Sequence, residues 1–199
     1  MFGKLVPASL VLLGLAVVPL AGSQKAGGGA DGAFKIDPVH TTVLFKIRHL
    51  GVSNFWGRFN EANGTVTVDA AKPAASKIHF SIPAAKVDTN NPDRDKHLRG
   101  PDFFNADEFK TIDFDSTKVE PKGKDELEVT GDLSLHGVKK PITVHVKQVG
   151  YADIPKMGAR VGFEVTFQVR RSDFGMKSAS DGGMLGDEVD LIVNVEAAK

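Results

Sequence analysis

The sequence predicts an all-β fold, an antiparallel barrel with one helical segment near its mouth, and three observations support this prediction. Apolar and polar residues alternate along most of the chain, as they do on strands with one buried and one wet face. The alternating segments are long and number eight or nine, which favours a closed barrel over a sandwich. Only residues 91–109 lack the alternation and look helical, with Asn91 or Asp93 as the expected N-cap.

The expected strands follow one another through most of the chain. The segments are 33–37, 41–49, 57–69, 76–87, 110–119, 124–136, 141–151, 159–170 and 187–197. We expect an up-and-down order, in which successive connections lie at alternate ends of the barrel.

The dipeptide Asn63-Gly64 leaves two alternatives for the third segment. A hairpin turn there would divide residues 57–69 and reverse the end at which every later connection lies. We expect a bulge instead, because the flanking pieces would be short and glycine inside a strand often marks a bulge.

The first 32 residues differ from the rest of the chain. Lys4, the apolar run LVPASLVLLGLAVVPL and the small residues that follow predict a cleaved export signal over residues 1–23. Residues 24–32 are rich in Gly and Ala and are expected to form a flexible leader to a domain over residues 33–197. The predicted location is therefore the periplasm, or the exterior if the source has no outer membrane. The sequence has no cysteine, which excludes lipidation, disulfides and thiol catalysis.

The strand order gathers the candidate functional residues at one end of the barrel. Connections 50–56, 88–109, 137–140 and 171–186 share this end, the mouth, and connections 38–40, 70–75, 120–123 and 152–158 share the other, the closed end. Aromatic residues, the helical segment and the loop RSDFGM all belong to the mouth. An ordered mouth of this kind is what a ligand-binding barrel requires.

His40 and His49 stand nine residues apart on one expected strand. An extended strand would separate them by roughly 30 Å, so they cannot share a metal ion. We expect His40 to have a structural role in the closed-end turn after Pro38, and His49 to belong to the mouth. An alternative is a metal- or His-dependent enzyme that uses His49 and His97, although no zinc-binding spacing supports it. We predict no metal site and no catalytic residue.

Charge and motifs exclude several other classes of function. Lys+Arg and Asp+Glu number 25 each, so there is no electrostatic case for binding nucleic acid or an anionic membrane surface. The chain has no phosphate-binding loop, dinucleotide-binding motif or nucleophile elbow.

The inward positions of the expected strands are mostly Val, Ile, Leu and Phe. A barrel of this size either fills its centre with side chains, as a purely structural or adhesive barrel would, or holds one small ligand.

Five segments in order along the chain resemble a known family. They are FKIDPVHTTVLFKIRHLGVSNFWGRF, VDTNNPDRDKHLRGPDFFNADEF, GDLSLHGVKKPI, RSDFGM and GDEVDLIVNVEA, and they span about Phe34 to Glu196. Together they resemble the YceI-like family of exported bacterial lipid-binding proteins. The resemblance implies an eight-stranded antiparallel lipocalin-like barrel with a long apolar pore, and a polyisoprenoid or other long-chain amphiphile as ligand.

The pattern and the resemblance together predict an exported, non-enzymatic protein that sequesters or carries an isoprenoid or similar lipid. No cofactor is expected beyond a bound polyisoprenoid, quinone or fatty-acyl ligand; a membrane is expected only as the lipid source, and a homodimer is left open. The predicted ligand contacts at the mouth are His49, Phe55, Trp56, Arg94, His97, Phe103, Phe104, Phe109, Phe174 and Met176. Those in the barrel wall are Phe45, Ile47, Phe80, Phe114 and Phe163.

Overall fold

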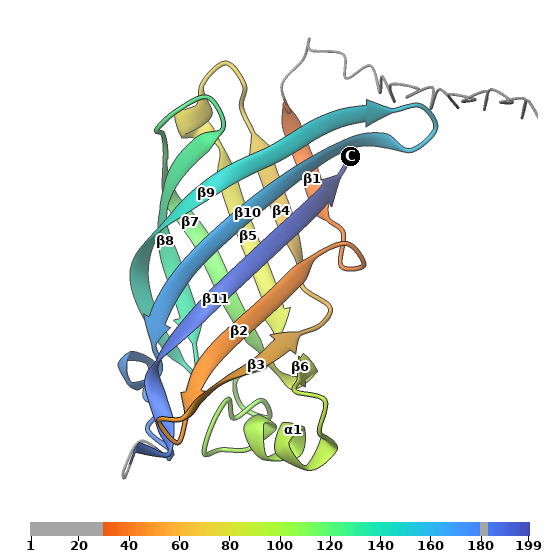
Figure 1. Cartoon of the computed structure of the whole chain (residues 1–199). Coiled ribbons are helices and arrows are strands. Elements are labelled where there is room, and N and C mark those ends of the chain that lie inside the picture. The colour runs from red at the N-terminus through yellow and green to blue at the C-terminus, as the bar shows by residue number, and fades with distance from the viewer. Residues whose placement is uncertain (1–29, 180–182) are drawn as a thin grey trace, which may run out of the picture.

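Antiparallel strands dominate the computed structural model, which describes residues 30–179 and 183–199 (Figure 1). The strands are β1 Gly32–Ile36, β2 Thr42–His49, β3 Ser53–Phe59, β4 Asn63–Val68, β5 Lys77–Pro83, β6 Val87–Asp88, β7 Thr111–Pro121, β8 Glu126–Leu135, β9 Val138–Ile154, β10 Gly158–Arg170 and β11 Leu185–Ala198. One α-helix, α1 Pro92–Arg99, and three short 3₁₀ turns, Pro73–Ala75, Ala84–Lys86 and Arg171–Phe174, accompany them in these residues. The expected export signal, residues 1–23, and most of the expected leader lie outside the described residues.

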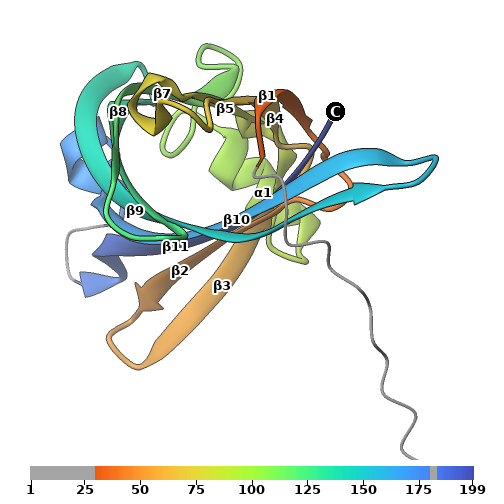
Figure 2. The same cartoon turned by 90° about the horizontal axis from the view of Figure 1, so that it is seen from above.

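The sheet closes into a barrel of eight strand positions, as predicted. β1 and β2 lie end to end beside β11 and together form the first wall position. β4 and β3 lie end to end in the second wall position, because β4 pairs with β1 and β3 pairs with β2. β5 and the two-residue β6 fill the third position in the same way. The ring then runs through β7, β8, β9, β10 and β11 and closes where Lys35 and Ile36 of β1 pair with Ala198 and Ala197 of β11. Seen from above, the strands surround one axis (Figure 2).

Residues 57–69, the third predicted segment, belong to one wall position of the barrel. This wall position is interrupted, but the interruption is not at the predicted place. Asn63 and Gly64 pair regularly with Ser81 and Phe80, so the expected bulge there is wrong. The break comes at residues 60–62, where Glu61 has a φ of 62°. No hairpin turn divides the segment, so every later connection lies at the predicted end.

His40 does not lie in an end turn, which corrects the prediction for it. Residues 37–41 interrupt the first wall position between β1 and β2, and β11 runs past the gap. His40 therefore lies in the side of the barrel rather than at its end.

The helical segment is shorter than predicted. Asn91 caps α1, because its side-chain oxygen accepts a hydrogen bond from the backbone N–H of Arg94 (2.9 Å). The helix ends at Arg99, where Gly100 is extended and Pro101 follows. Residues 101–108 form turns, and α1 lies at the mouth end of the barrel (Figure 1).

The closed end of the barrel is filled by its own side chains. Phe34, Ile36, Val119, Val129 and Val161 are each at most 2% exposed and belong to one apolar cluster. This cluster is the main core of the fold. No helix among the described residues is long and apolar enough to cross a membrane.

Candidate functional site: the barrel cavity and its mouth

The barrel encloses a cavity of about 530 Å³ that is lined mainly by apolar side chains. Its deeper wall includes Val66, Ile78, Val144 and Val146, which border the closed-end core. Residues of α1 and of the loops at the mouth also line it, so the cavity extends from the core to the mouth. The barrel is therefore hollow, and its cavity falls within the size range of small-molecule binding sites.

Strand alternation explains which side chains reach the cavity. On β2, Val43, Phe45, Ile47 and His49 line it, whereas Lys46 points outward and pairs with Asp190 of β11 (Nζ to Oδ2, 2.6 Å). A one-residue shift would reverse every one of these orientations, so the register of β2 on β11 defines the wall.

Most of the predicted contact residues line this cavity. They are Phe45, Ile47, His49, Phe55, Phe80, Arg94, His97, Phe103, Phe104, Phe114, Phe163 and Met176. These residues are distant in sequence, since they extend from Phe45 on β2 to Met176 in the loop after β10. The closure of the barrel brings them together around one apolar space.

Trp56 does not line the cavity, which corrects its predicted contact. It alternates with the inward residues Phe55 and Gly57 on β3 and is 48% exposed on the outer surface. Lys46, its partner on β2, places its ammonium 5.8 Å from the centre of the indole ring.

Phe109 and Phe174 are also absent from the cavity wall, because each packs within the mouth loops. The Phe109 ring lies against His136, with 5.1 Å between ring centres, and above Gly137, where a Cβ would meet the ring at 2.5 Å. Phe174 is 2% exposed and belongs to a small cluster with Leu133, Leu135 and Met176. Both residues shape the loops rather than the cavity surface.

A polar network fixes Arg94 at the mouth. Its Nε donates to Thr89 Oγ1 (2.8 Å) and its Nη2 donates to Thr89 O (2.7 Å). The backbone N–H of Thr89 in turn donates to Asp95 Oδ1 (2.8 Å), and both Thr89 and Asp95 are buried. The guanidinium carbon lies 4.4 Å from the centre of the Phe55 ring. The mouth thus holds a positioned cation beside an aromatic cavity residue.

His49 and His97, the two histidines of the alternative enzyme, both line the cavity. His97 Nε2 lies 3.5 Å from Asp102 Oδ2, and its ring meets Phe103 edge-on. Within residues 30–179 and 183–199, no group of three or more potential metal ligands includes either histidine. Among these residues, no cluster of metal ligands supports the metal-dependent form of the alternative enzyme.

A buried arginine organises the loop between β10 and β11. Arg171 is 4% exposed and donates to the carbonyl oxygens of Gly186 (2.8 Å) and Ser178 (2.6 Å), among others. Burial lowers the pKa of its guanidinium. Asp187 accepts hydrogen bonds from Ser172 Oγ (2.7 Å) and Ser172 N (2.9 Å), which lower the pKa of its carboxyl.

Sequence reasoning missed several lining residues. They include Phe59, Leu98, Phe167, Met184 and Leu185. Strand periodicity could have found Phe59 and Phe167, because both occupy inward positions of alternating segments. No local signal marks Met184, which reaches the cavity only through the fold of its loop.

Comparison with known proteins identifies the family. Residues 34–197 match the model of the YceI-like domain. The chain belongs to the YceI-like family. This confirms the resemblance inferred from the motifs.

The relatives cover most of the chain. Protein YceI of Shigella flexneri is 43% identical over 190 residues, covering 94% of this chain and 97% of the relative. The crystal structure of the Campylobacter jejuni YceI protein is 31% identical, with a TM-score of 0.68, and the match covers 77% of this chain and 90% of that chain. A polyisoprenoid-binding domain from Saccharophagus degradans has the same fold at 14% identity, with a TM-score of 0.64 over 83% of this chain and 97% of that chain.

Proposed function

We propose that this protein binds the hydrocarbon chain of an isoprenoid or similar amphiphilic lipid in its barrel and carries or sequesters it without catalysing a reaction. The observation that carries the proposal is the apolar cavity of about 530 Å³ that extends to the mouth. A structural neighbour described as a polyisoprenoid-binding domain supports the same class of ligand.

Hydrophobic burial supplies the affinity in this proposal. Each methylene moved from water into the cavity contributes roughly 0.8 kcal/mol, so a long chain needs few polar contacts. Because the burial of methylenes does not distinguish between these hydrocarbon chains, the apolar wall favours an isoprenoid, quinone or fatty-acyl chain equally. In this proposal, the polar head group meets Arg94 and His97, whose side chains line the cavity near the mouth.

In this proposal, residues 1–23 direct the protein out of the cytoplasm. The rim of the mouth is suited to taking up a lipid from a membrane in that compartment. Leu50 and Met184 are 53% and 50% exposed, yet both also line the cavity. The backbone N–H of Leu50 donates to Met184 O (2.8 Å), which holds the two loops together. Val52, 77% exposed, extends this apolar rim. We propose that the rim contacts the bilayer that supplies the lipid.

Native purification followed by lipid extraction and mass spectrometry tests the proposal. A long-chain lipid should co-purify, and the delipidated protein should bind fluorescent polyprenyl or quinone probes. A protein that carries no lipid and takes up none of these probes would contradict it.

Two neighbouring residues of β11 provide matched variants. Leu191 lines the cavity, whereas Ile192 does not and lies on the opposite face of the strand. Leu191→Trp should fill part of the cavity and abolish probe binding, while Ile192→Trp should preserve it. Equal binding by both variants would place the lipid outside the barrel.

A further inference from the structure

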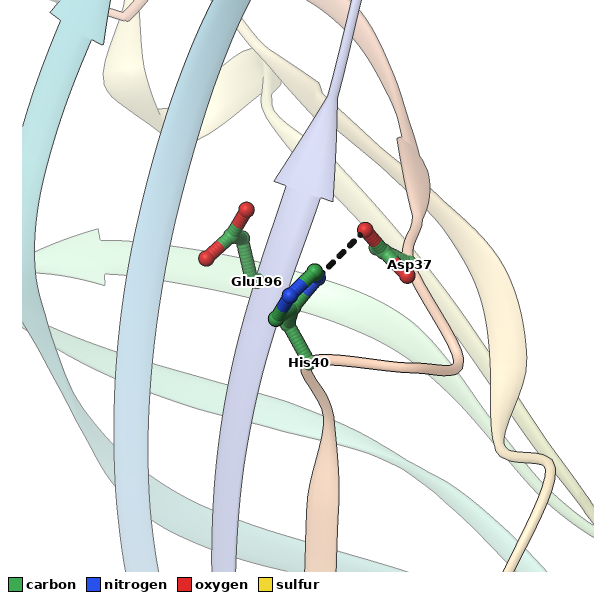
Figure 3. Close-up of side chains that lie close together, drawn as sticks. All are labelled: Asp37, His40 and Glu196. Atoms are coloured by element: carbon green, nitrogen blue, oxygen red, sulfur yellow. Dashed lines mark hydrogen bonds and ion pairs between the residues drawn. The ribbon is translucent and has the colours of Figure 1, made fainter.

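Three side chains with metal-ligating atoms meet far from the mouth, where the first wall position is interrupted. Asp37 and His40 belong to the connection between β1 and β2, and Glu196 lies on β11, which runs past the gap (Figure 3). One ligand atom from each lies within 4.8 Å of the others. Within the described part of the chain, this is the only such group of three.

Hydrogen bonds to main-chain atoms hold the interruption and β11 together. The N–H of Asp37 donates to Glu196 O (2.9 Å), which ties the interruption directly to β11. Thr41 Oγ1 donates to the same carbonyl oxygen (3.5 Å). The Val39 N–H donates to Asp37 Oδ1 (2.9 Å) and orients that carboxylate. The backbone positions of Asp37 and Glu196 and the orientation of the Asp37 carboxylate are therefore set by the fold before any ion arrives.

The side chains supply a ligand set suited to a divalent transition ion. One imidazole and two carboxylates form a mixed nitrogen and oxygen set, which Zn²⁺ accepts while keeping one or more positions for water. His40 Nδ1 and Asp37 Oδ2 form a hydrogen bond of 2.8 Å (Figure 3), which an ion bound between the two atoms would have to replace. Arg160 pairs with Glu196 (Nε to Oε1, 3.4 Å) and would have to release one carboxylate oxygen.

We propose that Asp37, His40 and Glu196 bind a divalent transition-metal ion, with Zn²⁺ as the probe, and that the ion fastens the seam of the barrel. The ion would act where this seam is interrupted: β2 pairs with β11 between His49 and Thr42, but β1 pairs with β11 at only two positions, Lys35 with Ala198 and Ile36 with Ala197. An ion bound here would join the first and last wall positions beside that short pairing, and it would stabilise the folded state by mass action.

The protein offers a matched control in a second histidine and carboxylate pair. His79 Nδ1 lies 2.7 Å from Asp115 Oδ1 on the outer face of β5 and β7, and both side chains are exposed. No third ligand joins this pair among the described residues. Zinc binding that requires only an exposed histidine beside a carboxylate should therefore occur at both places.

The test is calorimetric titration of ZnCl₂ into the untagged, chelator-treated protein, together with thermal melts with and without Zn²⁺. We expect one site per chain, an increase in Tm with Zn²⁺, and a loss of affinity of about tenfold or more in His40→Ala and in Glu196→Gln. His79→Ala should bind Zn²⁺ as the parent does. Glu196→Gln keeps the size of the side chain, and circular dichroism of both variants checks that they fold.

Three results would overturn the proposal: no binding of Zn²⁺, unchanged binding in His40→Ala and Glu196→Gln, or an equal loss in His79→Ala. The lipid-probe assay on the same variants keeps this proposal separate from the proposed function. Zinc binding without lipid binding, or the reverse, would contradict one proposal and leave the other standing.

Discussion

The two ends of the barrel are built from the same alternating strands but packed in different ways. At the closed end, Phe34, Val119 and Val129 are each at most 2% exposed and pack in one apolar cluster. Toward the mouth, the walls surround a cavity, and Leu50 and Met184 at its rim are half exposed. The closed end therefore contributes close packing to stability, whereas part of the apolar surface toward the mouth faces a cavity that is available to a ligand.

Removal of a closed-end aromatic ring should have the largest effect on stability. Phe34→Ala deletes a side chain that is 1% exposed, and should lower the free energy of unfolding by about 3–5 kcal/mol. Urea denaturation monitored by circular dichroism measures the change.

Phe55 of the mouth provides the matched substitution. It is partly exposed and lines the cavity, so Phe55→Ala should cost much less stability than Phe34→Ala but weaken the binding of polyprenyl probes. If the two variants lost equal stability, the division of the barrel into a stabilising end and a binding end would be wrong.

Gly57 tests how the cavity keeps its width. A Cβ at this position would lie 2.2 Å from the Phe45 ring, so Gly57→Ala must displace that ring. We expect a loss of about 1–3 kcal/mol and weaker probe binding, as the ring is forced from its place in the cavity wall. Gly150→Ala on β9 is the control, because nothing lies within 4 Å of its added Cβ.

The sequence predicted the barrel well because alternation records which face of each strand is buried. It placed Phe45 and Phe163 in the wall and Arg94 and His97 at the mouth, as the structure does. It failed for Trp56, where a position next to the mouth was given more weight than the alternation of β3. The environments of Phe109 and Phe174 depend on contacts with residues distant in sequence, His136 for Phe109 and the end of β8 for Phe174, which periodicity does not encode.

Acid should loosen the mouth through Asp187. Hydrogen bonds from Ser172 and the nearby charge of Arg171 lower the folded-state pKa of its carboxyl below the unfolded value of about 4. The stability that this carboxylate contributes is fully present above the unfolded-state pKa and is lost as the pH falls through the folded-state pKa. Asp187→Asn should therefore cost about 1 kcal/mol at pH 7 and have less effect at low pH.

Unfolding curves measured between pH 7 and pH 2 would check this dependence. Asp125→Asn, which removes an exposed carboxylate from a closed-end turn, serves as the control for the loss of one negative charge. A profile for Asp187→Asn that runs parallel to that of the parent would show that the carboxylate does not stabilise the loop.

The smallest expected change in stability is at the tip of the hairpin between β2 and β3, and it should have the opposite sign. Leu50 and Gly51 have φ values of 52° and 69°, and the Val52 N–H donates to His49 O (3.1 Å). Asn is favoured over Leu at such a position, so Leu50→Asn should raise the stability by up to about 1 kcal/mol.

The same substitution should slow the transfer of a polyprenyl probe from vesicles to the protein, because it removes an apolar side chain from the rim. Val149→Asn removes an exposed apolar side chain from β9, away from the cavity lining, and should leave the transfer rate unchanged. A more stable protein that loads more slowly would mean that the rim keeps a strained leucine for contact with the lipid source. Equal transfer rates for both variants would show that loading does not use the rim.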